Sequence, residues 1–259
     1  MNCERSTGLV GVCAMVLVSA AALAPPAAAG EGCWNAEYDF SDVQGLNDWW
    51  YGYWESPANA FTLMNEFGVA AVDFWTLDFL QPNPAYWTLI GPTVMHPNGS
   101  VSNAGKTLVE QQAILRWVST VSDTVTCKGH VDCSDLGGNG TEWIIRFNGN
   151  QVFSQIIGGF DTVGFDYSLQ FTVAPGDTID FAVATPNGDA NFDSTGFTAI
   201  IRSTKLPASP DLDENCIVDG ADLGLLLAAW GTSGPFGDLN NDGIVDGADL
   251  GLLLAGWTS

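Results

Sequence analysis

Basic residues are scarce in this chain of 259 residues. Seven Lys and Arg stand against 30 Asp and Glu, which gives a formal net charge of -23 at pH 7. Nucleic acid and anionic membrane surfaces bind clustered Lys and Arg, so this composition excludes both as expected partners. A balance this acidic indicates either a solvated acidic surface or carboxylates gathered around cations. Because Asp is concentrated near the C-terminus, we favour the second explanation there.

Long apolar runs are also missing, apart from one stretch from Gly8 to Ala24 that is short for a membrane span. A single arginine precedes this stretch, and small residues that include Ala27-Ala28-Ala29 follow it. The pattern predicts a secretory signal peptide over residues 1–29 and no membrane span. We therefore expect a secreted or extracellular protein, with attachment to the cell surface left open.

Catalytic signatures are equally rare. The sequence contains no G-x-S-x-G and no metal-hydrolase motif, and its only histidines, His96 and His130, lie in polar segments where we expect solvent exposure. A glycosidase needs two carboxylates across a cleft, and the sequence does not pair any of its acids in this way. We identify no catalytic residue and favour a non-catalytic protein. A glycoside hydrolase or polysaccharide lyase stays open as the enzyme alternative, and a structural cell-surface protein as the third.

Four cysteines follow the predicted signal peptide. Cys127 and Cys133 bracket the short polar stretch KGHVD, which predicts a loop closed by a local disulfide in an oxidising compartment. Pairing of Cys33 with Cys216 stays open.

The region from Ala70 to Arg202 is rich in strand patterns. Residues 165–173 alternate apolar and polar side chains, which predicts one buried face, and residues 178–184 are expected to return beside them after a turn. Residues 143–147 and 151–157 flank an Asn-Gly turn and predict a second hairpin. Many short strands separated by turns indicate a mainly β domain, a jelly-roll-like β-sandwich over residues 30–205.

The C-terminus carries a repeat. Residues 218–228 read VDGADLGLLLA and so do residues 245–255, and the two acidic segments 211–222 and 238–249 align without a gap. Oxygen-bearing side chains fall at positions 1, 3, 5, 9 and 12 of each segment, which is the spacing of an EF-hand-type calcium loop with a backbone carbonyl at position 7. The sequence predicts two Ca²⁺ ions, with candidate ligands Asp211, Asp213, Asn215, Ile217, Asp219, Asp222, Asp238, Asn240, Asp242, Ile244, Asp246 and Asp249.

One leucine-rich helix is expected after each loop, no helix is expected before either, and position 12 is Asp rather than Glu. This arrangement resembles a type I dockerin and covers residues 211–259. The resemblance implies a small all-α calcium-dependent module, 206–259 with its Pro-rich linker, that attaches to a cohesin-like protein domain. Unlike typical dockerins, this sequence has Gly-Ala at loop positions 10 and 11 and no Lys or Arg in either helix. We expect the two copies to pack leucine face to leucine face and to close off Trp230 and Trp257.

A sandwich beside a dockerin-like module resembles, loosely, a carbohydrate-binding module. Sugar rings stack on exposed aromatic faces, and the candidate glycan contacts are Trp49, Trp50, Tyr51, Tyr53 and Trp54, with core packing as the alternative. The oxygen-rich loop 188–194 could hold a third Ca²⁺ together with Asp39. The sequence thus favours a secreted protein that binds polysaccharide and attaches through its C-terminal module.

Overall fold

The computed structural model describes residues 32–68, 73–78, 85–205 and 209–258. The predicted signal peptide and part of the linker lie outside these residues. The sandwich strands are β1 (Cys33–Asn35), β2 (Trp49–Glu55), β3 (Thr62–Leu63), β4 (Glu66–Gly68), β5 (Phe74–Thr76), β6 (Leu89–Ile90), β7 (Val94–His96), β8 (Gln111–Val118), β9 (Asp123–Cys133), β10 (Thr141–Phe147), β11 (Asn150–Ile157), β12 (Phe165–Val173), β13 (Thr178–Ala184), β14 (Thr195–Phe197) and β15 (Ile200–Ser203). A 3₁₀ turn, Leu46–Asp48, precedes β2, and the helices α1 (Gly220–Ala228) and α2 (Gly247–Ala255) follow the sandwich.

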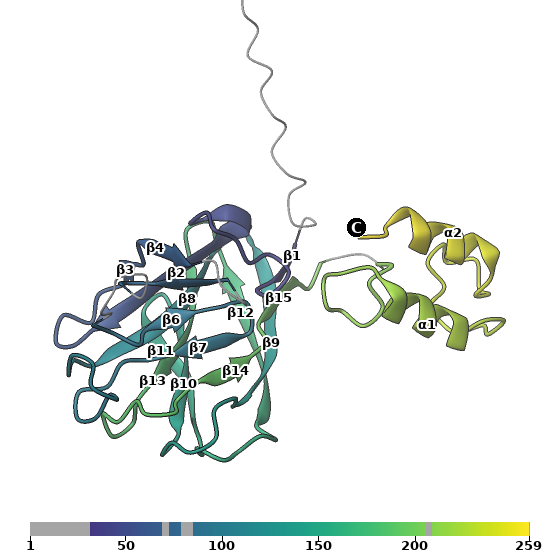
Figure 1. The fold of residues 1–259 in the computed structure, drawn as a ribbon. Helices are drawn as coiled ribbons and strands as arrows, with labels where there is room; N and C mark the ends of the chain where they lie inside the picture. The colour runs from purple at the N-terminus through teal and green to yellow at the C-terminus, as the bar shows by residue number, and fades with distance from the viewer. Residues whose placement is uncertain (1–31, 69–72, 79–84, 206–208, 259) are drawn as a thin grey trace, which may run out of the picture.

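The strands form two sheets, confirming a mainly β sandwich (Figure 1). One sheet has the order β1-β15-β9-β14-β7-β6-β5-β4, with β12 also paired to β9, and the other has the order β11-β10-β13-β8-β2-β3. Large aromatic side chains fill the space between them. Trp34 of one sheet meets Trp117 of the other edge to face at 4.9 Å between ring centroids, and Trp143 lies 5.9 Å from Tyr167. Rings of this size supply most of the apolar area that holds the two layers together.

Two strand predictions have different outcomes. The 143–157 hairpin is confirmed, because β10 and β11 pair antiparallel. The predicted pairing of residues 165–173 with 178–184 is wrong: β12 pairs with β9, whereas β13 lies between β8 and β10 in the other sheet. The burial of β13 on both faces explains the difference, since a strand with six of seven residues buried belongs in the centre of a covered sheet. The turn at 174–177 therefore carries the chain from one layer to the other.

The predicted Cys127–Cys133 disulfide is wrong. Both residues lie in the single extended strand β9, and both are buried free thiols. The two residues are six positions apart along the strand, which separates them by roughly 20 Å, far beyond the 7 Å that a disulfide can bridge. Lys128, His130 and Asp132 gave the segment its loop-like composition because they occupy the outer face of this strand.

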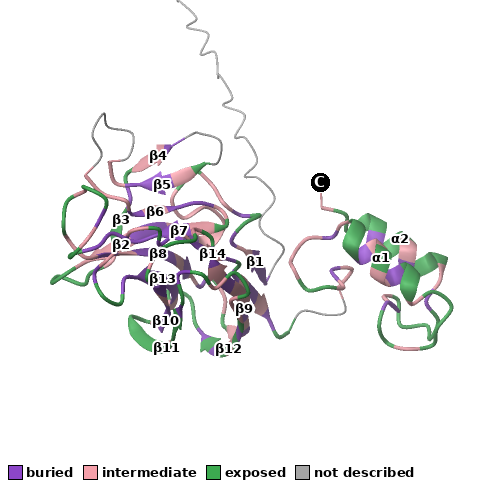
Figure 2. Ribbon diagram, turned by 60° about the horizontal axis from the view of Figure 1, so that its bottom comes forward, coloured by how far each residue is buried: buried purple, intermediate pink, exposed green. Residues whose placement is uncertain are grey.

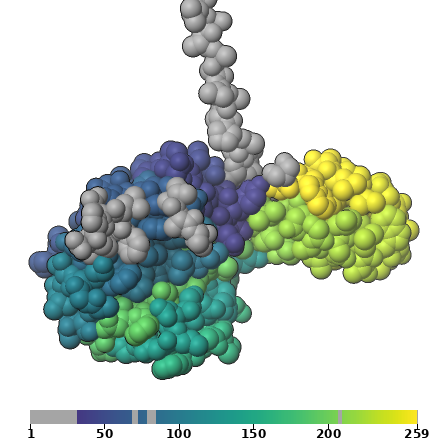
Figure 3. Space-filling model, in the orientation of Figure 1, coloured from purple at the N-terminus to yellow at the C-terminus, as the bar shows by residue number. Residues whose placement is uncertain are grey.

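A disulfide joins Cys33 to Cys216 instead, with 5.5 Å between the Cα atoms. It ties β1 to the first acidic loop of the C-terminal module. Arg202 pairs with Asp211, Lys128 pairs with Glu214 at 3.2 Å, and the Asn35 side chain donates to the Asn215 carbonyl at 2.8 Å. The module forms a separate lobe beside the sandwich and is held to it through its first loop (Figure 3).

The module has its own small core. Val218, Leu226, Val245 and Leu253 are buried between the two helices and their loops, as their equivalent positions in the two repeats suggest. The prediction that the helices close off Trp230 and Trp257 is wrong, because these side chains are 45% and 41% exposed. Apolar side chains are instead exposed along each helix and just after it, with Leu227 and Trp230 forming one stripe and Leu254 and Trp257 the other. Figure 2 shows the exposed residues of both helices in green. None of the helices in the described residues is long and apolar enough to cross a membrane.

The cysteine pairing can be tested by mass spectrometry of a non-reduced digest after alkylation. We expect a crosslinked peptide that contains Cys33 and Cys216. Cys127 and Cys133 should be alkylated only after denaturation, because burial protects both thiols and raises their pKa. A crosslink between Cys127 and Cys133 would contradict the structure.

Candidate functional site

The two acidic loops have closely matching geometry. In the first loop, Asp222 accepts backbone N–H groups from Leu212 at 2.6 Å and Asp213 at 3.2 Å through one oxygen, and from Asp219 at 2.8 Å through the other. In the second loop, Asp249 accepts from the equivalent Leu239, Asn240 and Asp246 at 2.8, 3.1 and 2.8 Å. Each of these carboxylates therefore fixes the path of its loop from the first turn of the following helix.

The first residue of each loop accepts the same two backbone hydrogen bonds in both repeats. Asp211 accepts from the backbone N–H groups of Asn215 and Cys216, and Asp238 accepts from those of Asp242 and Gly243. Asp219 and Asp246 cap their helices and form capping boxes with Asp222 and Asp249. The carboxylates at positions 1, 9 and 12 are thus held by hydrogen bonds to the backbone of their own loop in both repeats.

Carboxylates in the first loop come close enough to share one cation. Ligand atoms of Asp211, Asp213 and Asp222 lie within 4.8 Å of one another. Burial, followed by the neighbouring carboxylates of Asp222 and Asp211, raises the pKa of Asp213, and the Asn215 N–H offsets part of this rise. An all-oxygen cluster of this kind suits Ca²⁺ better than softer metals. At loop position 3 the first loop has Asp213 and the second has Asn240, which is uncharged. At position 5 the order is reversed, because the second loop has Asp242 where the first has Asn215.

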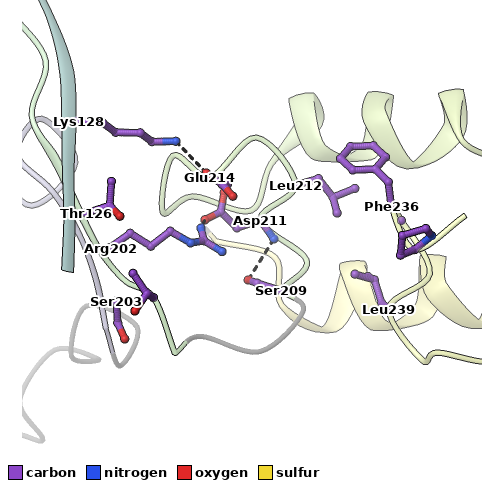
Figure 4. Close-up of a pocket in the computed structure, with 13 residues that line it drawn as sticks. Thr126, Lys128, Arg202, Ser203, Ser209, Asp211, Leu212, Glu214, Phe236 and Leu239 are labelled. Carbon is purple, nitrogen blue, oxygen red and sulfur yellow. Dashed lines mark hydrogen bonds and ion pairs between the residues drawn. The ribbon is translucent and has the colours of Figure 1, made fainter. Parts of the chain in front are cut away.

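The two loops differ in their surroundings. Cys216 stands where the second loop has Gly243, and both residues have positive φ, 72° and 96°. A side chain in this conformation costs roughly 1–2 kcal/mol, and the disulfide to Cys33 holds Cys216 in place. Arg202 binds Asp211 at the edge of a cleft of about 430 Å³ between the lobes (Figure 4). The first loop is therefore anchored to the sandwich, whereas within the part of the chain that the structure describes the second loop has no such disulfide or ion pair.

The aromatic segment in β2 faces two ways. Trp49 and Tyr51 are 0% and 1% exposed in the core, so the prediction that they contact glycan is wrong. Tyr53 is half-buried against the same core, and Trp50 packs on Gly45. Trp54 lies on the outer face with the Arg146 guanidinium 4.0 Å above its ring. Alternation along the strand places Trp49, Tyr51 and Tyr53 inside and leaves Trp50 and Trp54 on the other face, which the run of aromatic residues in the sequence did not resolve.

A pocket at the loop end of the sandwich was not predicted. It has a volume of about 230 Å³ and is lined by Trp87, Leu89, His96, Ala104, Asp135, Ala190, Asn191, Phe192 and Ser194. Phe192 is 56% exposed, and the Trp87 ring lies 5.9 Å from the His96 ring with Lys106 above it at 4.8 Å. Two aromatic side chains with amide, hydroxyl and carboxylate groups around them suit a polar ligand that has apolar faces.

His96 departs from its predicted exposure. It is buried in β7, and burial lowers the pKa of its ring, so it is neutral at pH 7. Its Nδ1 lies 2.6 Å from the Pro97 carbonyl and therefore donates, which leaves Nε2 as an acceptor. His130 lies in β9, half-exposed, beside Asp166 at 2.7 Å.

The loop 188–194 forms one wall of this pocket. The oxygen-bearing residues of this loop predicted a calcium site shared with Asp39, and no described contact joins Asp39 to the loop. Asp39 is engaged by the Asn35 N–H at 2.9 Å and the Trp49 indole N–H at 3.4 Å. Burial raises the pKa of Asp39 to about 6. The signal that could have located the pocket is the exposed Phe192 in a polar loop.

Comparisons with known proteins give limited information. No protein-family model matches the chain, and no curated protein matches it. Among solved structures, the chain is similar to a CBM51 module from Clostridium perfringens GH95 in complex with methyl-galactose, at 9% identity over 65% of this chain and 99% of that one, with a TM-score of 0.32. It is also similar to a CBM36-1 domain of a multidomain xylanase from the hindgut metagenome of Trinervitermes trinervoides, at 11% identity over 61% and 99%, with a TM-score of 0.31.

A family 35 carbohydrate binding module from Clostridium thermocellum matches at 12% identity over 43% of this chain and 91% of that one, with a TM-score of 0.27. Similarities at these scores carry no argument about what this chain binds. The pocket and the acidic loops are therefore interpreted from their own geometry.

Calcium in the acidic loops can be tested by hydrogen exchange on the whole protein. Replacing Asp249 with Asn should weaken three hydrogen bonds to a charged acceptor, each worth about 1.5–3 kcal/mol, and alter a predicted calcium ligand. We expect amides of α2 to exchange at least about tenfold faster in calcium buffer, while those of α1 change little. Asn240→Ala is the milder comparison and should cause a smaller effect. Equal α2 protection in calcium and in chelator would contradict calcium binding at this loop.

Proposed function

We propose that this protein is secreted, binds polysaccharide through its sandwich, and attaches to a cohesin-like partner through a calcium-dependent, dockerin-like module. The observation that carries the first part is the loop-end pocket, where Trp87 and Phe192 stand among polar groups. A sugar ring buries its C–H face on an aromatic ring while its hydroxyls exchange hydrogen bonds with amides, carboxylates and a neutral imidazole. Asn191, Asp135 and His96 supply those three groups.

The side chain of Asn191 is held in place before any ligand arrives. Its Nδ2 donates to the Ser102 hydroxyl and, at 2.6 Å, to Asp189. Because both amide hydrogens are engaged, the carbonyl oxygen of this side chain is the group left to accept from a hydroxyl. A pre-positioned acceptor lowers the entropy cost of binding.

The attachment function is supported by the repeated loops and by the surface of the helices behind them. Leu227 and Leu254 are each 53% exposed, and Trp230 and Trp257 lie one turn further along the same stripes. Neither helix carries a basic residue. A partner would therefore bind this module mainly through apolar contacts. The calcium loops would fix the position of the two helices relative to each other.

Glycan binding can be tested by retention on immobilised polysaccharides, with release of reducing ends measured in parallel. We expect retention on at least one polysaccharide without turnover. Trp87→Ala should weaken binding roughly tenfold, since losing an aromatic stacking surface costs on the order of 1–2 kcal/mol. Trp50→Ala is the matched control. Trp50 is a tryptophan of β2, the strand whose aromatic residues the sequence predicted to bind glycan, and it does not line the pocket, so this variant should bind normally.

The outcomes of this experiment separate the alternatives. Loss of retention in Trp50→Ala with no change in Trp87→Ala would move the site to the face of β2. Release of reducing ends would replace the binding module with a glycan-degrading enzyme. Absence of retention on every polysaccharide would leave a structural surface protein.

The docking face can be tested by surface plasmon resonance against type I cohesin domains. We expect binding in calcium and its loss in chelator. Leu227→Asp combined with Leu254→Asp should abolish binding, because two charges would be buried in an apolar contact. Val152→Asp, on an exposed apolar position of the sandwich, is the control and should bind normally. Binding that persists in the Leu227→Asp, Leu254→Asp protein would place the partner elsewhere.

A further inference from the structure

A buried carboxylate with unsatisfied oxygens lies next to the loop-end pocket. Asp193 is only 1% exposed, and neither of its carboxylate oxygens makes a hydrogen bond of standard geometry within the described part of the chain, although the Gly140 N–H lies close enough to lower its pKa. A buried polar group normally has a partner, and leaving a charged one without any is costly. The arrangement therefore points to a missing partner.

Two backbone carbonyls converge beside this carboxylate. A Cβ added to Gly138 would stand 2.5 Å from the Asp193 Oδ1, 2.6 Å from the Asn191 carbonyl oxygen and 2.7 Å from that of Phe192. Three oxygens thus surround one small region, and the absence of a side chain at Gly138 keeps it open. A cation would lie slightly to one side of the Cβ position, because the Gly138 Cα is already roughly 1.5 Å away from it.

The local charge also favours a cation. Burial raises the pKa of Asp193 to about 7; the carboxylates of Asp189 and Asp135 add to this rise, and the Gly140 N–H offsets part of it. Asp189 belongs to the same loop as Asp193, whereas Asp135 belongs to a different one. A positive ion between the loops would offset the repulsion and supply the partner that the buried oxygens lack.

We propose that Asp193, with the backbone carbonyls of Asn191 and Phe192, holds a Ca²⁺ ion that joins loop 188–194 to the Gly-rich turn at 137–140. Oxygen ligands that include backbone carbonyls are the set that Ca²⁺ takes, at about 2.3–2.6 Å and in flexible geometry. The ion is distinct from those proposed for the C-terminal loops and shares no residue with them.

The same ion would shape the glycan pocket. Its two carbonyl ligands belong to Asn191 and Phe192, whose side chains line that pocket. Phe192 has φ +60°, a conformation that a bulky residue adopts only when its surroundings hold it there. Binding of the ion would hold this backbone and so keep the aromatic ring in the pocket wall. This consequence rests on the proposed glycan binding, whereas the ion site itself does not.

Native mass spectrometry of the whole protein in calcium tests the site by counting bound ions. We expect Asp193→Asn to hold one ion fewer than the wild type. Asp166→Asn, which changes an exposed carboxylate of the same domain, should hold the wild-type number. An unchanged count in Asp193→Asn would overturn the proposal.

A second protein covers the case in which Asp193→Asn does not fold. Asp222→Asn combined with Asp249→Asn disables both C-terminal loops and leaves the sandwich untouched. This protein should still bind one Ca²⁺, and binding of none would overturn the proposal.

Polysaccharide retention then tests the effect on the pocket. We expect Asp193→Asn to lose retention about as strongly as Trp87→Ala. A lower ion count with unchanged retention would show that the ion does not shape the pocket. If the wild type binds no polysaccharide but Asp193→Asn still loses one ion, the glycan proposal fails and the ion site stands.

Discussion

The packing of aromatic rings between two antiparallel sheets determines the rest of this structure. Trp49, Trp117 and Trp143 are completely buried, and each comes from the six-stranded sheet. Side chains alternate along a strand, so placing these rings inside fixes which face of each strand points outward. The outward faces and the strand ends then have defined positions. The loop-end pocket and the anchor of the C-terminal module both depend on them.

Carboxylates in this protein are arranged in three different ways. Asp180 forms a close ion pair with Arg116 at 2.6 Å, the usual solution for a buried charge. Asp222 and Asp249 instead collect backbone N–H groups, and these donors lower the pKa of Asp249. Asp193 has no ion pair, and neither of its oxygens makes a hydrogen bond of standard geometry among the described residues. The three environments explain why a chain with so few basic residues can bury acids, provided that cations or backbone donors replace the missing Lys and Arg.

The C-terminal module illustrates how one repeat can acquire two roles. Its loops share their hydrogen bonds residue by residue, but among the described residues only the first is linked to the sandwich by a disulfide and by ion pairs from β9 and β15. The second loop contributes Leu239 to the lining of the cleft beside these contacts. The disulfide, the ion pairs and the Asn35 hydrogen bond thus tie the module to the sandwich on the side of its first loop.

The sequence by itself determined the features that depend on near neighbours in the chain. Alternation in 165–173 gave the inner face of β12, the Asn-Gly turn gave the β10–β11 hairpin, and the repeat gave two acidic loops, each followed by a helix. These features follow from local geometry and local hydrogen bonds. Tertiary structure alone decided which sheet received β13, which cysteines paired, and which of the β2 aromatics were buried. It also brought Trp87, Asn191 and Phe192 to one pocket. Contacts of this kind join residues up to 183 positions apart, and they are fixed by how the two sheets pack, a property that no short stretch of sequence contains.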